Sequence, residues 1–188
     1  MNLPPIFDLS GTAYQQTRIA HWDLAAKQRD HWQGAGIWYH RRLAEIYRFN
    51  TMPGLKVLEL GCGDGRLLAA LKPERGVGLD FSSEMVRRAR QLHPELEIHQ
   101  ADAHDLSGID GTFDVVILSD LVNDLWDVQC VFEQIKPLCA AHTRIILNFY
   151  SRLWQAPLNI ARKLNIADRK STRLNSSHER LSRMPSSA

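Results

Sequence analysis

The sequence predicts an α/β fold built on a parallel β-sheet, and three observations predict it. Between residues 53 and 167, short apolar runs recur five times, separated in most cases by amphipathic stretches. Each run is apolar at successive positions, which is typical of strands that helices cover on both faces. No internal repeat accompanies this pattern, so we expect one sheet.

The elements follow one another in a simple order. Helical periodicity predicts two N-terminal helices, at about residues 12–32 and 36–49, and Met52-Pro53-Gly54 then breaks the helical pattern. Ser82 or Ser83 is the expected N-cap of a later helix. We expect strands at 56–60, 77–80, 96–99, 113–118 and 144–149, and helices at 65–71, 83–92, 127–138 and 151–164.

Composition excludes several classes of protein. A chain of 188 residues with 44% hydrophobic residues is long enough to bury a core. No apolar run approaches the roughly 20 residues of a membrane helix, and the first ten residues do not read as a secretory signal. The three cysteines form no CxxC pair and the eight histidines form no metal-binding motif. We therefore expect a cytoplasmic protein without a membrane span or a metal site.

Residues 168–188 are interpreted as a tail that is not natural protein. Residues 168–178 read DRKSTRLNSSH, a peptide that a sequencing-library adapter encodes, and SRMPSSA at 182–188 matches the adapter's continuation in the same frame. The alternative is a natural Ser/Arg-rich disordered tail. Five of the 23 basic and two of the 21 acidic residues lie there, so the body carries a net charge of −1. This charge favours no nucleic-acid partner, and we expect the natural chain to continue past Ala167.

A glycine-rich loop follows the first predicted strand. It reads Gly61-Cys62-Gly63-Asp64-Gly65 and precedes a helix, so its backbone can approach an anionic group. Arg66 stands where the dinucleotide pattern G-x-G-x-x-G needs glycine. Glu59 is expected either to touch a ligand or only to order the loop, and Cys62 is interpreted as a small spacer rather than a nucleophile.

Polar residues also stand where the next three strands end, at the edge where parallel sheets bind ligands. Asp80 ends the second strand, and its carboxylate can accept two hydrogen bonds from the hydroxyls of a ribose. Asp102 follows the third strand and can accept from an adenine amino group. Asp120 follows the fourth, and Asp120 and His104 are the candidate general bases. Helix capping is the alternative role for Asp120, and a solvated loop position is the alternative for His104.

Four segments together resemble the class I S-adenosylmethionine-dependent methyltransferases. They are VLELGCGDG, GVGLDFSSEMV, ADAHDL and FDVVILSDL, in that family's order and spacing over about residues 53–150. The resemblance implies a Rossmann-like, doubly wound parallel sheet of five strands in the order 3-2-1-4-5, with N-terminal helices and without the family's usual strands 6 and 7. It implies a helical lid at 1–52 and an incomplete cofactor-binding domain at 53–167, before the tail at 168–188.

The resemblance also implies which residues hold S-adenosylmethionine. The glycines of the loop wrap the methionine portion, Asp80 holds the ribose, Asp102 and Ala103 frame the adenine, and Ser119 lies near the methyl donor. The expected cofactor-binding set is Glu59, Gly61, Cys62, Gly63, Gly65, Asp80, Phe81, Asp102, Ala103 and Ser119. Asp120 and His104 remain the catalytic candidates.

Methyl transfer to a small-molecule, sugar or lipid-linked acceptor is the implied activity. Residues 119–122 lack the Asn/Asp-Pro-Pro-aromatic pattern of enzymes that methylate nucleic-acid bases or glutamine, so no nucleic acid is expected. A looser likeness, in SDLVNDLWDVQ and NFYSRLW, points to methyltransferase domains found beside bacterial glycosyltransferases. Two alternatives stay open: a non-catalytic cofactor-binding module, and a nicotinamide-dependent oxidoreductase, which Arg66 disfavours.

Overall fold

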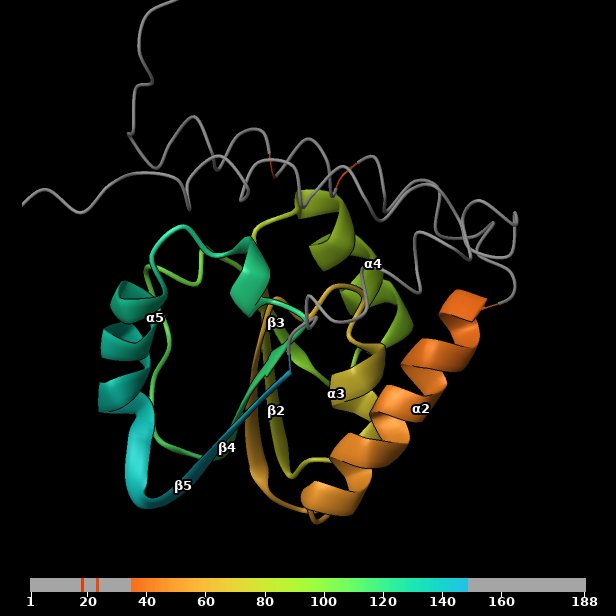
Figure 1. Ribbon diagram of the computed structural model, residues 1–188, viewed down its shortest axis with the longest axis horizontal. Coiled ribbons are helices and arrows are strands. Elements are labelled where there is room, and N and C mark those ends of the chain that lie inside the picture. Colours follow the sequence, from red (N-terminus) through yellow and green to blue (C-terminus); the bar gives the residue numbers. More distant parts are fainter. Residues whose placement is uncertain (1–17, 19–22, 24–34, 149–188) are drawn as a thin grey trace, which may run out of the picture. The chain divides into compact units, whose positions relative to one another are not determined.

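A five-stranded parallel sheet forms the centre of the described part of the chain, which comprises residues 18, 23 and 35–148 of a computed structural model (Figure 1). The strand order is β3-β2-β1-β4-β5, which confirms the predicted order 3-2-1-4-5. All described residues belong to a unit that spans residues 1–149. The helix expected at 151–164 lies outside the described residues, as does most of the one expected at 12–32.

The elements agree with the predicted ones to within a few residues, except at the last strand. The strands are β1 (Lys56–Leu60), β2 (Arg75–Asp80), β3 (Glu97–Gln100), β4 (Phe113–Ser119) and β5 (Cys139–Asn148). The helices are α2 (Ala35–Asn50), α3 (Arg66–Ala70), α4 (Ser83–Leu92) and α5 (Val128–Ile135), with short 3₁₀ turns η2 (Val122–Asp124) and η3 (Lys136–Leu138).

Strand β5 begins at Cys139, five residues before its predicted start. Its pairing with β4 passes through an irregularity, because Phe113 pairs with Cys139 whereas Val115 pairs with Arg144. The first half of β5 reads CAAHT and is partly exposed. It contains no run of large or β-branched apolar residues from which a strand is predicted, and the ladder with β4 extends it.

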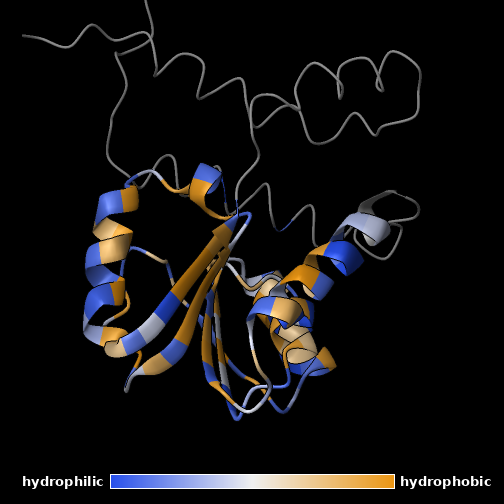
Figure 2. Ribbon diagram, turned by 60° about the horizontal axis from the view of Figure 1, so that its bottom comes forward, coloured by the Kyte–Doolittle hydropathy of each residue, from blue (hydrophilic) through white to orange (hydrophobic). Residues whose placement is uncertain are grey.

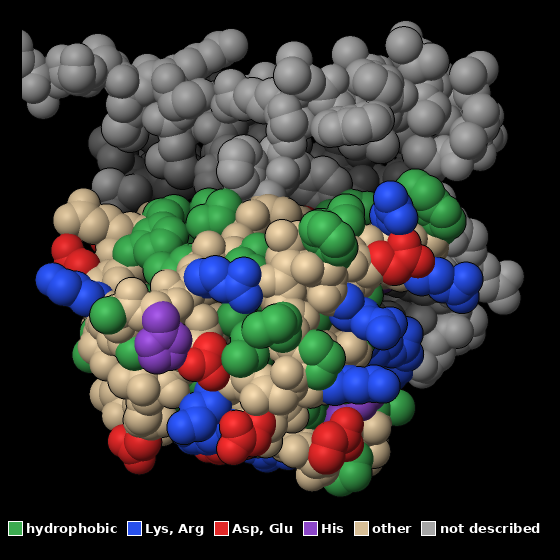
Figure 3. Space-filling view, turned by 90° about the horizontal axis from the view of Figure 1, so that it is seen from below, with side chains coloured by type: hydrophobic (Ala, Val, Ile, Leu, Met, Phe, Trp, Pro, Cys, Tyr) green, Lys and Arg blue, Asp and Glu red, His purple; other side chains and the backbone are tan. Residues whose placement is uncertain are grey.

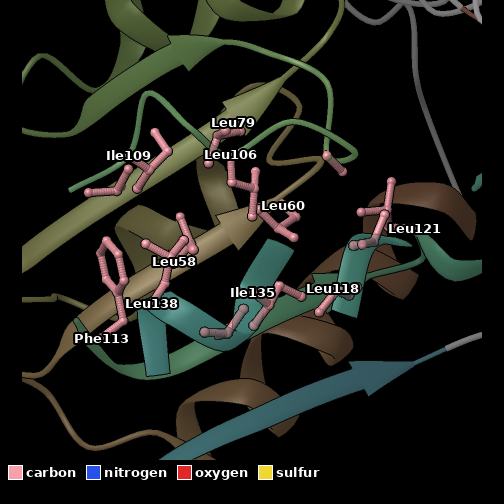
Figure 4. Packing of buried hydrophobic residues seen from close by; sticks show 14 of the residues in the cluster. Leu58, Leu60, Leu79, Leu106, Ile109, Phe113, Leu118, Leu121, Ile135 and Leu138 are labelled. Carbon is pink, nitrogen blue, oxygen red and sulfur yellow. The ribbon is translucent and has the colours of Figure 1, made fainter. Parts of the chain in front are cut away.

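Helices cover both faces of the sheet, with α5 on one side and α2, α3 and α4 on the other (Figure 1). Successive strand residues point to opposite faces. Leu58, Leu60 and Leu118 thus belong to the cluster that includes Ile135 of α5 (Figure 4). Strand residues one position away from these leucines pack on the other side of the sheet; they include Val57, Val115 and Ile117. Figure 2 shows the resulting apolar strands between partly polar helices.

Side-chain caps begin two of the helices at the carboxyl edge of the sheet. The Ser82 hydroxyl accepts a hydrogen bond from the Met85 backbone N–H at 3.2 Å, so Ser82 rather than Ser83 is the N-cap of α4. The Asp127 carboxylate accepts one from the Cys130 N–H at 2.9 Å at the start of α5. Such caps typically contribute about 1 kcal/mol each, and they fix where the adjoining loops lie.

Strand β2 needs glycine where the glycine-rich loop crosses it. A Cβ atom at Gly78 would lie 2.8 Å from both the Cys62 Sγ and the Ile98 Cδ1. Both neighbours are buried in the core. The close approach of the loop to β2 therefore depends on the missing side chain at this position.

The opposite end of the molecule carries mixed charges. Seen from below, its surface carries both basic and acidic side chains, and several of the basic ones lie next to one another at the right of the view (Figure 3). Within the described residues, no helix has the length and the apolar character needed to cross a membrane.

Candidate functional site

A pocket lies at the carboxyl edge of the sheet, where ligands of parallel sheets are expected. Loops after β1, β2, β3 and β4 line it, together with one residue from the N-terminal segment. The lining residues are Arg18, Gly61, Leu79, Asp80, Phe81, Ala101, Asp102, Ala103, His104, Leu121, Asp124, Leu125 and Trp126. Six of the predicted site residues thus meet here: Gly61, Asp80, Phe81, Asp102, Ala103 and His104.

The glycine-rich loop is a tight turn at the floor of this pocket. Gly61, Gly63 and Gly65 have φ angles of 69°, 55° and 76°, in the left-handed region that favours glycine. A Cβ atom at Gly61 would lie only 2.9 Å from the Leu121 Cδ1, so the loop after β4 packs directly on this glycine. The loop therefore presents backbone rather than side chains toward the pocket.

The Asp80 carboxylate organises this loop. Its Oδ2 accepts a hydrogen bond from the Gly63 N–H at 2.9 Å, and its Oδ1 accepts one from the Ser82 N–H at 2.9 Å. Asp80 therefore joins the loop after β1 to the start of α4. Each carboxylate oxygen has two lone pairs, so these two bonds leave acceptor capacity for a ribose hydroxyl.

Glu59 and Cys62 lie in the core and not in the lining of the pocket. Glu59 is 2% exposed and Cys62 is 6% exposed. Burial raises the pKa of the Cys62 thiol, and the nearby carboxylates of Glu59, Asp80 and Asp64 raise it further. An unreactive, buried thiol fits the predicted role of a small spacer. Asp80 makes a contact that orders the loop, and both roles expected for Glu59 stay predictions.

His104 uses both ring nitrogens within the protein. Its Nδ1 lies 2.5 Å from the Asp102 Oδ1, which also accepts from the His104 backbone N–H at 2.8 Å. The Asp127 N–H donates to its Nε2 at 3.3 Å, so the proton of the neutral ring sits on Nδ1. The ring also stacks on Trp126, with centroids 4.8 Å apart. These contacts fix His104 at the junction of the β3 loop and α5, and its role as a general base stays a prediction.

Asp120 is the centre of a hydrogen-bond network between α2 and the ends of β4 and β5. The Tyr39 hydroxyl lies 2.9 Å from both carboxylate oxygens, and the Asn148 Nδ2 donates to Oδ1 at 2.5 Å. The Asp120 backbone N–H donates to the Asn148 Oδ1 at 3.2 Å, and the Tyr47 hydroxyl donates to the same oxygen at 2.7 Å. Burial raises the pKa of Asp120, although the hydrogen bonds from Tyr39 and Asn148 oppose this.

Sequence reasoning missed Tyr39 and Asn148. Asn148 ends β5, so the rule that polar residues at strand ends build the site would have found it. Tyr39 lies 81 residues before Asp120 and carries no local signal. Ser119 lies next to this network, half-buried at the end of β4, and does not line the pocket.

Two N-terminal residues also reach the pocket loops. The Arg18 guanidinium forms an ion pair with the Asp124 carboxylate and is 8% exposed. The Ser82 hydroxyl donates a hydrogen bond to the Asp23 carboxylate. Neither residue was among the predicted site residues, because a helical pattern alone does not show what its polar residues meet.

Among residues 18, 23 and 35–148, no three His, Cys, Asp or Glu side chains are grouped so that they can hold a metal ion.

Comparisons with known proteins agree with this geometry. Residues 57–141 match a family model described as "Methyltransferase domain". A phosphatidylethanolamine N-methyltransferase of Cereibacter sphaeroides is 34% identical over 53% of this chain and 53% of its own length. A dTDP-3-amino-3,6-dideoxy-alpha-D-glucopyranose N,N-dimethyltransferase of Streptomyces fradiae is 34% identical over 40% of this chain and 31% of its own. The chain thus spans about half, or less, of the length of these curated relatives.

A solved structure shows the same fold. The magnesium protoporphyrin IX methyltransferase of Synechocystis PCC 6803 superimposes with a TM-score of 0.61 at 18% identity, over 80% of each chain. At this identity the likeness concerns the fold alone. Residues 57–141 thus match the methyltransferase domain family, which confirms the predicted resemblance of this chain to the S-adenosylmethionine-dependent methyltransferases.

Proposed function

We propose that this chain is an S-adenosylmethionine-dependent methyltransferase that acts on a small-molecule, sugar or lipid-linked acceptor. One observation carries the proposal: a single pocket gathers the glycine-rich loop, Asp80 and Asp102 at the carboxyl ends of adjacent strands. The family match of residues 57–141 supports the same activity. The curated relatives named above act on small or lipid-linked amines according to their names.

The pocket residues fit the parts of S-adenosylmethionine one by one. The backbone of Gly61 to Gly65 faces the methionine portion, Asp80 accepts from the ribose hydroxyls, and Phe81 and Ala103 border the adenine. Asp102 accepts from the adenine amino group in this arrangement. We add Arg18 to the predicted set, because it is the only lysine or arginine among the described lining residues. Its guanidinium is suited to bind the cofactor's carboxylate.

The protein's contribution to the reaction is mainly positioning. Bound S-adenosylmethionine supplies an electrophilic methyl group, so catalysis requires an acceptor held in line and at short range. The loop after β4 packs on Gly61 and is therefore close to the methionine portion of the cofactor. Asp120 begins this loop and is the described residue best placed to orient the acceptor.

Calorimetric titration of the full chain with S-adenosylhomocysteine tests the proposal. We expect binding of S-adenosylhomocysteine and none of NAD. Asp80→Ala is expected to lower the affinity at least tenfold, whereas Asp110→Ala, an exposed acid outside the pocket, keeps it. Thermal melting of each variant shows whether it is folded. Binding of NAD in place of S-adenosylhomocysteine would overturn the proposal, and cofactor binding without transfer to any acceptor would support a non-catalytic module instead.

A further inference from the structure

We propose that Asp120 is an anionic subsite for the ammonium group of the acceptor, so that the reaction is methylation of an amine. This inference rests on the methyltransferase function proposed above and narrows its acceptor class. It is carried by the position of the carboxylate, by the contacts that hold it and by the charges around it.

Asp120 lies close to the glycine-rich loop. Asp120 directly follows β4, and β4 pairs with β1, which leads into the glycine-rich loop. The next residue, Leu121, approaches Gly61 so closely that a Cβ atom there would lie 2.9 Å from the Leu121 Cδ1. Asp120 itself does not line the pocket, but it directly precedes Leu121, which does, and it is only partly buried. A group bound there lies next to the part of the pocket assigned to the methionine portion of the cofactor.

The backbone and the carboxylate of Asp120 are both fixed by contacts with other elements. Asp120 has a φ angle of 54°, a left-handed conformation that is rare for residues other than glycine, although aspartate tolerates it better than most. Such residues typically persist only where surrounding contacts fix them, and they cluster at functional sites. Asn148 binds both the backbone N–H and the carboxylate of Asp120, and Tyr39 binds the carboxylate from α2. Contacts from two other elements thus fix one partly accessible carboxylate.

The groups that bind the Asp120 carboxylate do not compensate its negative charge. Tyr39 and Asn148 are neutral donors, so they orient the carboxylate without neutralising it. None of the ion pairs found among the described residues involves Asp120. The nearby Asp124 carboxylate is paired with Arg18, so it adds little net charge of its own. Within the described part of the chain, Asp120 is thus a partly buried carboxylate held by neutral donors, which is a favourable site for a positively charged ligand.

The chemistry of amine methylation fits this site at every stage. The acceptor ammonium gives one proton to the Asp120 carboxylate, and the nitrogen lone pair then bonds to the methyl carbon. The carbon–sulfur bond breaks with its electron pair on sulfur, which leaves S-adenosylhomocysteine. The proton passes from Asp120 to water, and the product is again an ammonium, which the same carboxylate can hold. A hydroxyl acceptor, by contrast, carries no positive charge before the transfer, so a carboxylate held by neutral donors offers it no ion pair.

Matched acceptor pairs test the inference. The probes are phosphatidylethanolamine against phosphatidylglycerol in detergent micelles, and dTDP-3-amino-3,6-dideoxyglucose against dTDP-6-deoxyglucose. Transfer of a radiolabelled methyl group is measured for the full chain, for Asp120→Asn and for the control Asp110→Asn. We expect label in an amine and not in its hydroxyl partner. We expect Asp120→Asn to raise the KM for that amine at least tenfold, with an unchanged affinity for S-adenosylhomocysteine.

The outcomes separate this inference from the function on which it rests. Failure of the wild-type chain to bind S-adenosylhomocysteine removes the proposed function itself. Binding of S-adenosylhomocysteine with label in a hydroxyl partner, or in no amine probe, overturns the ammonium subsite alone. The same holds if Asp120→Asn methylates the amine with the KM of the control. The unchanged cofactor affinity of Asp120→Asn shows that the variant is folded.

Discussion

The Asp80 carboxylate accepts a hydrogen bond from the Gly63 backbone N–H at 2.9 Å, across the gap between the ends of β2 and β1. Its other oxygen accepts from the Ser82 N–H. The residue expected to hold the ribose thus also holds the loop that would wrap the methionine portion of the cofactor. We therefore expect cofactor affinity and loop stability to be coupled through the Asp80 side chain.

Asp80→Asn is expected to weaken both properties. The amide replaces one acceptor oxygen with an NH₂ group, which then faces a backbone N–H and leaves it without a partner. An unsatisfied buried donor typically costs about 1–3 kcal/mol. We therefore expect a lower free energy of unfolding in urea and at least a tenfold loss of affinity for S-adenosylhomocysteine. Unfolding at the wild-type midpoint would contradict the coupling, and Asp110→Asn serves as the control.

Gly78→Ala is expected to destabilise the fold without touching the pocket lining. The new methyl group would lie 2.8 Å from the Cys62 Sγ and from the Ile98 Cδ1, and both side chains are buried in the core. Overpacking of this kind typically costs about 1–3 kcal/mol. Gly108→Ala is the matched control, since nothing lies within 4 Å of a Cβ atom there. Equal melting temperatures of the two variants would show that the loop can shift away from β2.

The fold was more predictable from the sequence than the contacts of the site. The apolar runs at β1, β2 and β4 are buried on both faces, so the local sequence alone predicts these strands and their burial. The early start of β5 could not be predicted, because its pairing with β4, and not its own composition, makes Cys139 to Thr143 part of a strand. At the site, strand ends predicted that Asp80, Asp102 and Asp120 gather at one edge. Their partners, such as Tyr39, come from distant helices and leave no local pattern.

His104→Phe separates a positioning role from that of a general base. Phenylalanine keeps an aromatic ring against Trp126 but loses the contacts with Asp102 and the Asp127 N–H. We expect a lower melting temperature and weaker binding of S-adenosylhomocysteine, because the adenine side of the pocket is loosened. The pH dependence of methyl transfer is expected to keep its shape. Loss of the acidic limb from the pH profile, with normal stability, would instead identify His104 as the base.

Cys62 is expected to be the least reactive thiol of the native protein. It is 6% exposed, and burial together with three nearby carboxylates raises its pKa, so little thiolate forms near neutral pH. Cys130 and Cys139 are partly exposed. Timed alkylation with iodoacetamide, followed by peptide mass spectrometry, measures the three rates. Modification of Cys62 as fast as of the other two would show that the glycine-rich loop opens readily.

Asp120→Asn is expected to stabilise the protein at neutral pH, and by less in acid. Burial raises the pKa of Asp120 in the folded state, so the native protein binds this proton more tightly than the unfolded chain. The ionised carboxylate therefore costs stability above its folded-state pKa. This cost disappears as the pH falls below the ordinary value of an aspartate, because both states are then protonated.

Urea unfolding of the wild type and of Asp120→Asn at pH 7 and near pH 3.5 measures this difference. The pKa values of Glu97 and Asp114 are lowered by hydrogen bonds, the largest contributions coming from His99 and from the Lys56 backbone. These two acids lose their stabilising contacts in acid in both proteins alike, so the comparison isolates Asp120. A stability gain that shrinks toward low pH confirms that a charged carboxylate is held there at a cost, as an ammonium subsite requires. A difference that does not change with pH would show that the network holds Asp120 as a neutral structural link between α2 and β5.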